Sequence, residues 1–131
     1  MARIWFLSGA LLGGLGVAAG AFGAHGLKAH FAANGQADNW ETAVRYCLFH
    51  AVALLVVAVA TGLPAAAACR GRLWAAGACF TAGTAIFSGL LAILAYTGLR
   101  ILGAVVPIGG VLLIAGWATL FAAGLQLGSA E

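Results

Sequence analysis

Charged side chains are scarce in this sequence, which has six Lys or Arg residues and three Asp or Glu residues among 131. Six basic residues scattered along the chain do not form the basic surface that nucleic acid requires, so nucleic-acid binding is not expected. Three carboxylates leave almost no room for acid–base catalysis by carboxylate pairs. The sequence also lacks a phosphate-binding loop, an HExxH motif and a serine nucleophile elbow. We therefore expect no catalytic residues and no enzymatic activity.

Cysteines are few, and their spacing does not suggest a metal centre. Cys47, Cys69 and Cys79 are odd in number and form no CxxC pair. Two of them lie within apolar runs, where a free cysteine behaves as a small hydrophobic residue. Neither a disulfide nor a metal site is expected.

Apolar residues are what the sequence has in abundance: 64% of it is hydrophobic, and its mean hydropathy is +1.09. Four apolar runs are long enough to cross a hydrocarbon core of about 30 Å, and they predict helices at residues 4–27, 40–69, 73–97 and 101–127. A signal peptide is the alternative for the first run, but its 24 uncharged residues exceed the about 7 to 15 apolar residues of a signal. Residues 1–131 are therefore expected to be a single membrane domain, an all-α four-helix bundle with short loops in the lipid bilayer.

The stretch between the first two runs, residues 28–40, is the most polar part of the chain. It predicts a short interfacial helix that Asn34-Gly35 ends. Asp38 and Glu41 stand at capping-box spacing, which predicts that the second helix begins near residue 39 with Asp38 or Asn39 as its N-cap.

An even number of spans places both termini on one side of the membrane, together with a tight turn predicted at residues 70–72. Three basic residues lie on each side: Arg3, Arg70 and Arg72 with the termini, and Lys28, Arg45 and Arg100 opposite. Because basic residues in short loops favour the cytoplasmic side, Arg70 and Arg72 favour cytoplasmic termini.

Small residues predict how the helices pack. Five glycines of the first run recur at spacings of 4, 3, 4 and 3 and share one helix face: Gly9, Gly13, Gly16, Gly20 and Gly23. A similar stripe on the third run consists of Gly77, Thr81, Thr84 and Ser88. Small residues let helix backbones approach closely in lipid. We expect a partner helix against the glycines, from this chain or from a second copy, and we favour packing over a substrate or proton path for the stripe.

The fourth run contains Pro107-Ile-Gly-Gly110. Proline removes one backbone hydrogen bond and clashes with the preceding turn. Pro107 is therefore predicted to kink the fourth helix, or to divide it into a short lead-in and a main span.

Polar and ionisable residues gather near one expected end of the bundle. The cluster consists of His25, Glu41, Arg45, Tyr46, His50 and Arg100. If Lys28 and Arg45 mark the interface, the two histidines lie roughly 4 and 7 Å below it, and Glu41 can pair with Arg45 at i, i+4 spacing.

The cluster allows two classes of interpretation. In the first, it anchors the helices at the interface. In the second, it forms a pocket for a lipid headgroup or quinone, a proton relay, or a haem site with His25 and His50 as axial ligands. The haem interpretation is weakened because His25 points about 160° away from the centre of the glycine face.

Several motifs carry a family resemblance: GAFGAHGLK at residues 20–28, WETAVRY at 40–46 followed by Phe49-His50, FSG at 87–89, and PIGG at 107–110 followed by AGW at 115–117. Together they resemble the bacterial domain-of-unknown-function family 423, which is similar to the eukaryotic transmembrane protein 256. The resemblance implies a small four-helix protein of the bacterial inner membrane and supplies no activity. Cys47 stands where the resemblance leads us to expect a polar residue such as Gln, which weakens a polar relay through that position.

The sequence thus predicts a non-catalytic membrane protein, acting as a structural or accessory subunit of a larger membrane complex or as a small homo-oligomer held by the glycines. The alternative is a binding or transport module whose polar end takes a lipid headgroup, a quinone or haem around His25 and His50.

Overall fold

The computed structural model describes residues 2–128 and contains only helices and turns over that range. The elements are α1 (Ala2–His25), α2 (Lys28–Asn34), α3 (Ala37–Gly62), the 3-10 helix η1 (Pro64–Cys69), α4 (Arg70–Thr84), the π turn η2 (Ala85–Gly89), α5 (Leu90–Thr97), the 3-10 helix η3 (Arg100–Ala104) and α6 (Val106–Gly124). Four helical stretches are long and apolar enough to cross a membrane: Ala2–His25, Ala37–Gly62, Pro64–Thr97 and Arg100–Gly124. The predicted all-α membrane bundle is confirmed.

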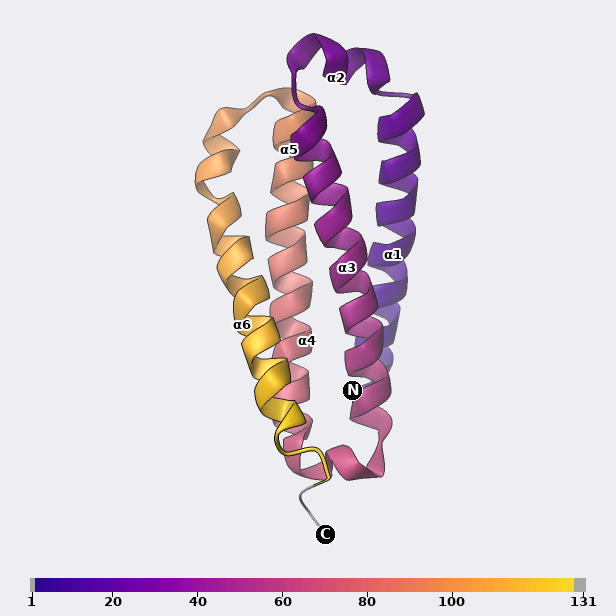
Figure 1. The fold of residues 1–131 in the computed structure, drawn as a ribbon, viewed down its shortest axis with the longest axis vertical. Helices are drawn as coiled ribbons and strands as arrows, with labels where there is room; N and C mark the ends of the chain where they lie inside the picture. The colour runs from indigo at the N-terminus through magenta and orange to yellow at the C-terminus, as the bar shows by residue number, and fades with distance from the viewer. Residues whose placement is uncertain (1, 129–131) are drawn as a thin grey trace.

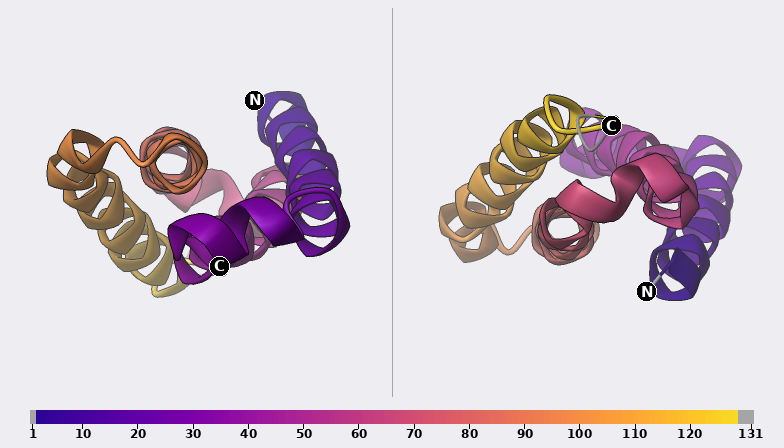
Figure 2. Two further views of the ribbon diagram at one scale, coloured as in Figure 1. Left: turned by 90° about the horizontal axis from the view of Figure 1, so that it is seen from above. Right: turned by 90° about the horizontal axis from the view of Figure 1, so that it is seen from below.

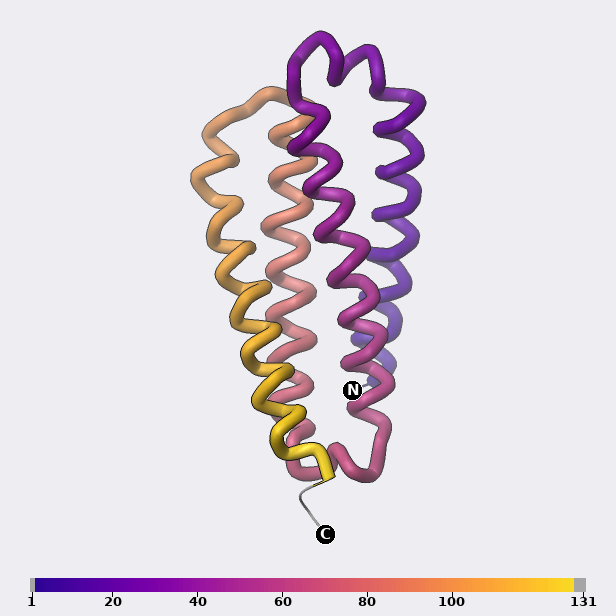
Figure 3. The backbone as a smooth tube through the Cα atoms, in the orientation of Figure 1, coloured from indigo at the N-terminus to yellow at the C-terminus, as the bar shows by residue number. Residues whose placement is uncertain are grey.

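The four stretches stand side by side, with α1 and α6 on the outside (Figure 1). Seen along the bundle they form a curved row, in which α1 packs on α3, α3 packs on α4 and α5, and α4 packs on α6 (Figure 2). The backbone trace shows that α1 begins and α6 ends at the same end of the bundle (Figure 3). The short helix α2 crosses the opposite end, between α1 and α3.

The second predicted helix ends earlier than the sequence suggested, at Gly62 instead of residue 69. Leu63 is extended, with φ −74° and ψ 138°, as expected for a residue that precedes a proline. Pro64 then opens η1. The predicted tight turn at residues 70–72 is wrong, because these residues form the first turn of α4 and η1 makes the connection.

The start of α3 also differs from the prediction. The short helix before it is confirmed, and Gly35 ends that helix in a left-handed conformation with φ 69°. However, α3 begins at Ala37 with Gln36 as its N-cap, and no side chain caps it. The capping box is wrong because Asp38 already lies inside the first turn of α3. Instead, the Gln36 side-chain oxygen accepts a 2.7 Å hydrogen bond from the Asn39 amide.

Pro107 occupies one of the first two positions of α6, where its missing N–H has no helical partner to lose. The 3-10 helix η3 precedes it as a separate lead-in. Of the two arrangements predicted at Pro107, the structure thus shows the divided helix, and the proline starts the main span.

The glycine face of α1, here named the glycine seam (Gly9, Gly13, Gly16, Gly20 and Gly23), lies against α3 of the same chain. A Cβ atom added at Gly9 would stand 2.8 Å from the Ala51 carbonyl oxygen, and one at Gly16 would stand 2.7 Å from the Leu48 side chain. The Trp40 indole N–H donates a 3.0 Å hydrogen bond to the Ala19 carbonyl across the same contact. Because α3 covers the seam, a second copy cannot pack there.

A second glycine contact joins α4 and η2 to α6. A Cβ at Gly83 would lie 2.7 Å from the Leu113 side chain, and one at Gly116 would lie 2.6 Å from the Phe80 ring. At Gly109 the added atom would overlap the backbone of Phe87 in the π turn. The sequence analysis missed this contact because it treated the glycines after Pro107 only as part of a helix break.

The four residues of the predicted stripe on the third span do not act alike. Gly77 lies against the Trp5 ring of α1, and the Thr81 hydroxyl donates a 2.9 Å hydrogen bond to the Gly77 carbonyl. Thr84 and Ser88 are buried, and their hydroxyl oxygens have no hydrogen-bond partner among the residues that the structure describes. Packing and local hydrogen bonds thus account for Gly77 and Thr81 but not for the hydroxyls of Thr84 and Ser88.

Candidate functional site

The structure separates the two histidines that the sequence placed near each other. His50 lies at the middle of α3, and its neighbour Ala51 faces Gly13, at the middle of α1. His25 is the last residue of α1 and is exposed. His25 lies twelve positions after Gly13 in the sequence, so the two histidines lie about 18 Å apart along the bundle. They do not converge, and His50 lies much deeper than the 7 Å expected from the sequence.

Both ring nitrogens of His50 are engaged within the protein. His50 is 5% exposed. Nδ1 lies 2.8 Å from the Tyr46 carbonyl oxygen, and the Trp117 indole N–H donates to Nε2 over 3.1 Å. A carbonyl can only accept and an indole N–H can only donate, so these bonds assign the neutral tautomer with its hydrogen on Nδ1. This arrangement leaves no free nitrogen to ligate a haem iron, and it favours a structural role for His50.

The remaining members of the predicted cluster divide between two sides of α3 and the end of the bundle. The Tyr46 ring stacks on Phe87 with centroids 4.5 Å apart, on the side that faces the rest of the bundle. Arg100 is exposed at the start of η3. Glu41 and Arg45 line a groove beside α1. No ion pair within 4.0 Å joins Glu41 to Arg45 in the part of the chain that the structure describes, so the expected pairing is not observed.

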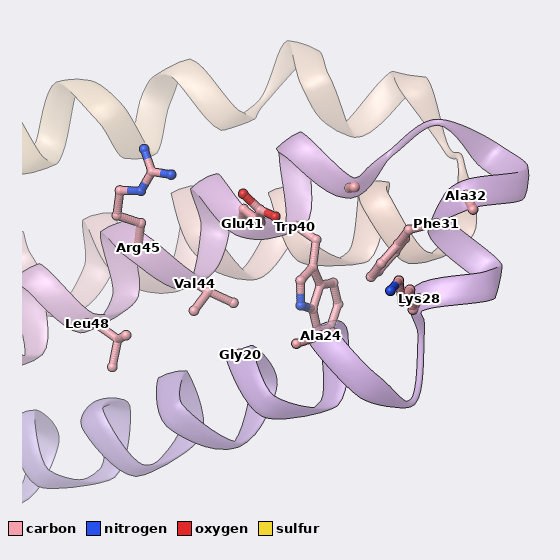
Figure 4. A pocket seen from close by; sticks show the side chains of 12 residues that line it. Gly20, Ala24, Lys28, Phe31, Ala32, Trp40, Glu41, Val44, Arg45 and Leu48 are labelled. Atoms are coloured by element: carbon pink, nitrogen blue, oxygen red, sulfur yellow. The ribbon is translucent and has the colours of Figure 1, made fainter.

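The groove lies between the last turns of α1, the helix α2 and the first half of α3, and we name it the α1–α2–α3 groove (Figure 4). Its volume is about 650 Å³. Its wall includes small and apolar residues together with three charged side chains. The residues that define it here are Gly20, Lys28, Phe31, Trp40, Glu41 and Arg45.

Two sets of contacts fix the shape of the groove. The Phe31 ring packs on Trp40 with centroids 5.2 Å apart, and the indole of Trp40 is already held by its hydrogen bond to α1. The roof, α2, is tied to the end of α5. There the His30 ring donates to the Tyr96 carbonyl over 2.9 Å, and the Asn34 amide donates to the Ala95 carbonyl over 3.1 Å. The groove is thus built by packing of the chain itself.

The charges in the groove are two cations and one anion, all exposed: Lys28, Arg45 and Glu41. Figure 4 shows Arg45 and Glu41 on successive turns of α3, with Lys28 at the start of α2. Arg45 lies five residues beyond Trp40, about 7 Å further into the span. An ionisable side chain within a membrane span is costly, so it marks a site of interaction more often than a soluble surface charge does.

Sequence reasoning found only part of this groove. It selected Glu41 and Arg45 but used Lys28 only as a marker of the interface. The signal that could have added Lys28 is its position, because the chain must turn back there before α3 begins. The residues expected alongside them, His25, Tyr46, His50 and Arg100, do not line the groove.

Comparison with known proteins agrees with the family resemblance noted in the sequence. Residues 19–110 match a family model described as protein of unknown function, DUF423. A UPF0382 membrane protein of Staphylococcus haemolyticus is 41% identical, over 90% of this chain and 92% of the relative. The UPF0382 membrane protein YwdK of Bacillus subtilis is 37% identical, over 95% of this chain and 98% of the relative.

Neither relative's name states an activity or a ligand. No solved structure gives a significant match. The relatives are called membrane proteins and four helical stretches of this chain are able to span a bilayer, so it is a membrane protein. On the family match and the two alignments together, the chain belongs to the DUF423 family of membrane proteins, whose function is unknown.

Proposed function

We propose that this protein is a non-catalytic membrane protein that binds an anionic lipid headgroup in the α1–α2–α3 groove. The observation that carries the proposal is the pair of exposed cations, Lys28 and Arg45, without ion-pair partners in the described part of the chain, beside a preformed groove of about 650 Å³. A phosphate is the natural partner of Arg and Lys, because it accepts charge-assisted hydrogen bonds from both. The apolar wall of the groove then accepts the first part of the acyl chains.

Glu41 narrows the choice of headgroup. Its carboxylate accepts hydrogen bonds and repels a second negative charge. A headgroup that combines one phosphate with hydroxyl groups, as in phosphatidylglycerol, satisfies both cations and the carboxylate. A phosphocholine headgroup offers the carboxylate no hydrogen-bond donor, and its quaternary ammonium cancels the charge of its phosphate.

The experiment is native mass spectrometry of the protein in a mild detergent with an equimolar mixture of phosphatidylglycerol and phosphatidylcholine of matched acyl chains. We expect one phosphatidylglycerol to remain bound in preference to phosphatidylcholine. Equal retention of the two lipids would contradict the proposal.

A role as an accessory subunit or homo-oligomer stays a prediction, but the glycine seam cannot be its interface because α3 covers it. Any second copy or larger partner must use another face. The same mass spectra test this alternative, since a stable oligomer or partner changes the mass of the protein component and leaves the lipid preference unaffected.

For orientation, we propose that both termini face the cytoplasm of a bacterial cell membrane. The sequence placed three basic residues on each side of the membrane. The structure supports removing Arg45 from that balance, because it lies two turns inside α3, whereas the other five basic residues lie in the first turn of their helices. Arg3, Arg70 and Arg72 then outnumber Lys28 and Arg100, which favours cytoplasmic termini. Modification of an added cysteine at residue 2 by a membrane-impermeant reagent on intact cells would contradict this orientation.

A further inference from the structure

The short helix α2 has two faces with different partners. One face carries Lys28, Phe31 and Ala32, which line the α1–α2–α3 groove. The other face carries His30 and Asn34, four residues apart, which bind the end of α5. A helix of seven residues is too short to be stable alone, so contacts with the rest of the chain determine where α2 stands.

Asn34, the last residue of α2, binds two other elements at once. Its side-chain amide nitrogen donates a 3.1 Å hydrogen bond to the Ala95 carbonyl near the end of α5. Its side-chain oxygen accepts a 3.0 Å hydrogen bond from the backbone N–H of Gln36, the N-cap of α3. A carbonyl can only accept and a backbone N–H can only donate, so the two bonds fix which end of the amide faces which partner. Asn34 thus joins α2 to both α5 and α3.

Further contacts support the connection between α2 and α5. Ala95 and Tyr96 belong to the last turn of α5, where a helix leaves carbonyl groups without helical partners. His30 donates to the Tyr96 carbonyl over 2.9 Å, and the centroids of the two rings are 5.1 Å apart. Phe31 and Ala95 belong to one buried cluster. Side chains of α2 therefore supply donors to carbonyls that α5 leaves free, and the position of α2 depends on the end of the third span.

The turn between α2 and α3 also separates the two cations of the groove. Lys28 is the first residue of α2, whereas Arg45 lies two turns inside α3. Asn34 closes this turn through its bond to Gln36 and anchors it through its bond to α5. Groups that bind one ligand together must be held at the right separation by residues that do not touch the ligand. Asn34 occupies such a position between the two cations.

We propose that Asn34 is a positioning residue for lipid recognition, which holds Lys28 and Arg45 at the separation that lets one phosphate contact both. The inference rests on the proposed function of the α1–α2–α3 groove, which Asn34 itself does not line. Without the Asn34 side chain, the turn loses its closing bond and α2 loses an anchor on α5. Lys28 then moves relative to Arg45, and a phosphate contacts only one of them. The apolar wall still holds a lipid, but the selection of its headgroup weakens.

The test is a double-mutant cycle on Asn34 and Lys28, measured by native mass spectrometry with the equimolar mixture of phosphatidylglycerol and phosphatidylcholine. We expect Asn34→Ala to lower the preference for phosphatidylglycerol about threefold to fivefold, because the hydrogen bonds that hold α2 are lost. In the Lys28→Gln background, Asn34→Ala is expected to lower the preference no further, because the cation that Asn34 positions is gone. A preference that Lys28→Gln lowers and Asn34→Ala leaves unchanged would overturn the inference without affecting the proposed function.

Asn39→Ala is the matched control. The Asn39 amide also donates a hydrogen bond, but its acceptor is the Gln36 side chain, so the bond stays at the start of α3 and does not reach α2 or α5. The lipid preference of this variant is expected to stay within twofold of the unmodified protein. An equal loss in Asn39→Ala would indicate a general loosening of this end of the bundle and would contradict the positioning role.

Two other outcomes are also decisive. Additive losses from Asn34→Ala and Lys28→Gln would contradict the positioning role, because Asn34 would then act independently of the cation. If Lys28→Gln leaves the preference unchanged, the proposed function fails together with this inference. Circular dichroism of each variant verifies that its helix content is retained.

Discussion

Trp117 and His50 join α6 to α3 through a 3.1 Å hydrogen bond near the middle of the spans. The bond connects two helices that are not neighbours in the sequence. Beside it, the rings of Phe80 and Trp117 pack with their centroids 5.1 Å apart. A histidine at this depth invites a cofactor or proton-relay interpretation. The geometry instead makes it a link between helices.

Replacement of Trp117 by Phe tests this link. The variant keeps an aromatic ring but removes the donor to His50 Nε2, so we expect a loss of about 1 kcal/mol in the free energy of unfolding, the scale of interhelical hydrogen bonds in membranes. Thermal unfolding followed by circular dichroism in detergent measures the effect. Trp74→Phe is the matched control, because Trp74 is exposed and its indole donates no hydrogen bond to any residue that the structure describes. A larger loss in the control than in Trp117→Phe would argue against the link.

Gly109 and Gly110 are adjacent residues, and alanine substitutions at the two positions together test the contact between α6 and the π turn. An added Cβ at Gly109 overlaps the Phe87 backbone and lies 2.9 Å from the Gly83 carbonyl oxygen, whereas one at Gly110 meets the Phe87 ring at an ordinary 3.7 Å. Gly109→Ala is therefore expected to destabilise the protein by about 1 to 3 kcal/mol, because backbone must move. Gly110→Ala is expected to be neutral or slightly stabilising. Equal unfolding temperatures for the two variants would show that this contact is looser than the structure indicates.

The glycine seam is tested in the same way on α1. An alanine at Gly9 places its Cβ 2.8 Å from the Ala51 carbonyl oxygen, but one at Gly14 meets no atom within 4 Å. We expect Gly9→Ala to separate α1 from α3 and to lower the unfolding temperature. Gly14→Ala should raise it slightly, because Ala in a helix interior is more favourable than Gly by roughly 0.5 to 1 kcal/mol. The seam assignment fails if Gly9→Ala is as stable as Gly14→Ala.

Thr84→Val is expected to stabilise the protein or leave its stability unchanged, whereas most substitutions in a protein core destabilise it. It replaces a buried hydroxyl that lacks a partner with a methyl group of similar size, so it removes a desolvation cost of about 1 to 3 kcal/mol. The unfolding temperature in detergent is therefore expected to rise or stay equal. A clear decrease would mean that the hydroxyl has a partner in the protein.

The sequence was sufficient for the four spans and for the short helix after the first span, because both depend on local patterns of apolar and turn residues. It also grouped the five seam glycines on one face, since that depends only on helix periodicity. It could not show that α3 covers this face, because the choice between a partner helix and a second copy depends on tertiary packing.

The depth of His50 was the main quantity that the sequence could not supply. Its position was measured from Arg45 as an interface marker, but α3 begins at Ala37 and Arg45 lies two turns inside it. Likewise, no local pattern revealed the π turn or the separation of Thr84 and Ser88 from their usual carbonyl partners. The π turn lies where α6 approaches the third span so closely that Gly109 has no room for a side chain, and a local sequence pattern does not show such a tertiary contact.

Lipid recognition by the α1–α2–α3 groove is tested most directly by the lipid preference of the groove variant. Lys28→Gln/Arg45→Gln keeps the size of the groove and removes both cations, while Arg100→Gln removes a cation that does not line it. In native mass spectra with the equimolar lipid mixture, we expect the preference for phosphatidylglycerol to fall about fivefold to tenfold in the groove variant and to persist in Arg100→Gln. An unchanged preference in the groove variant, or an equal loss in Arg100→Gln, would contradict lipid recognition by the groove.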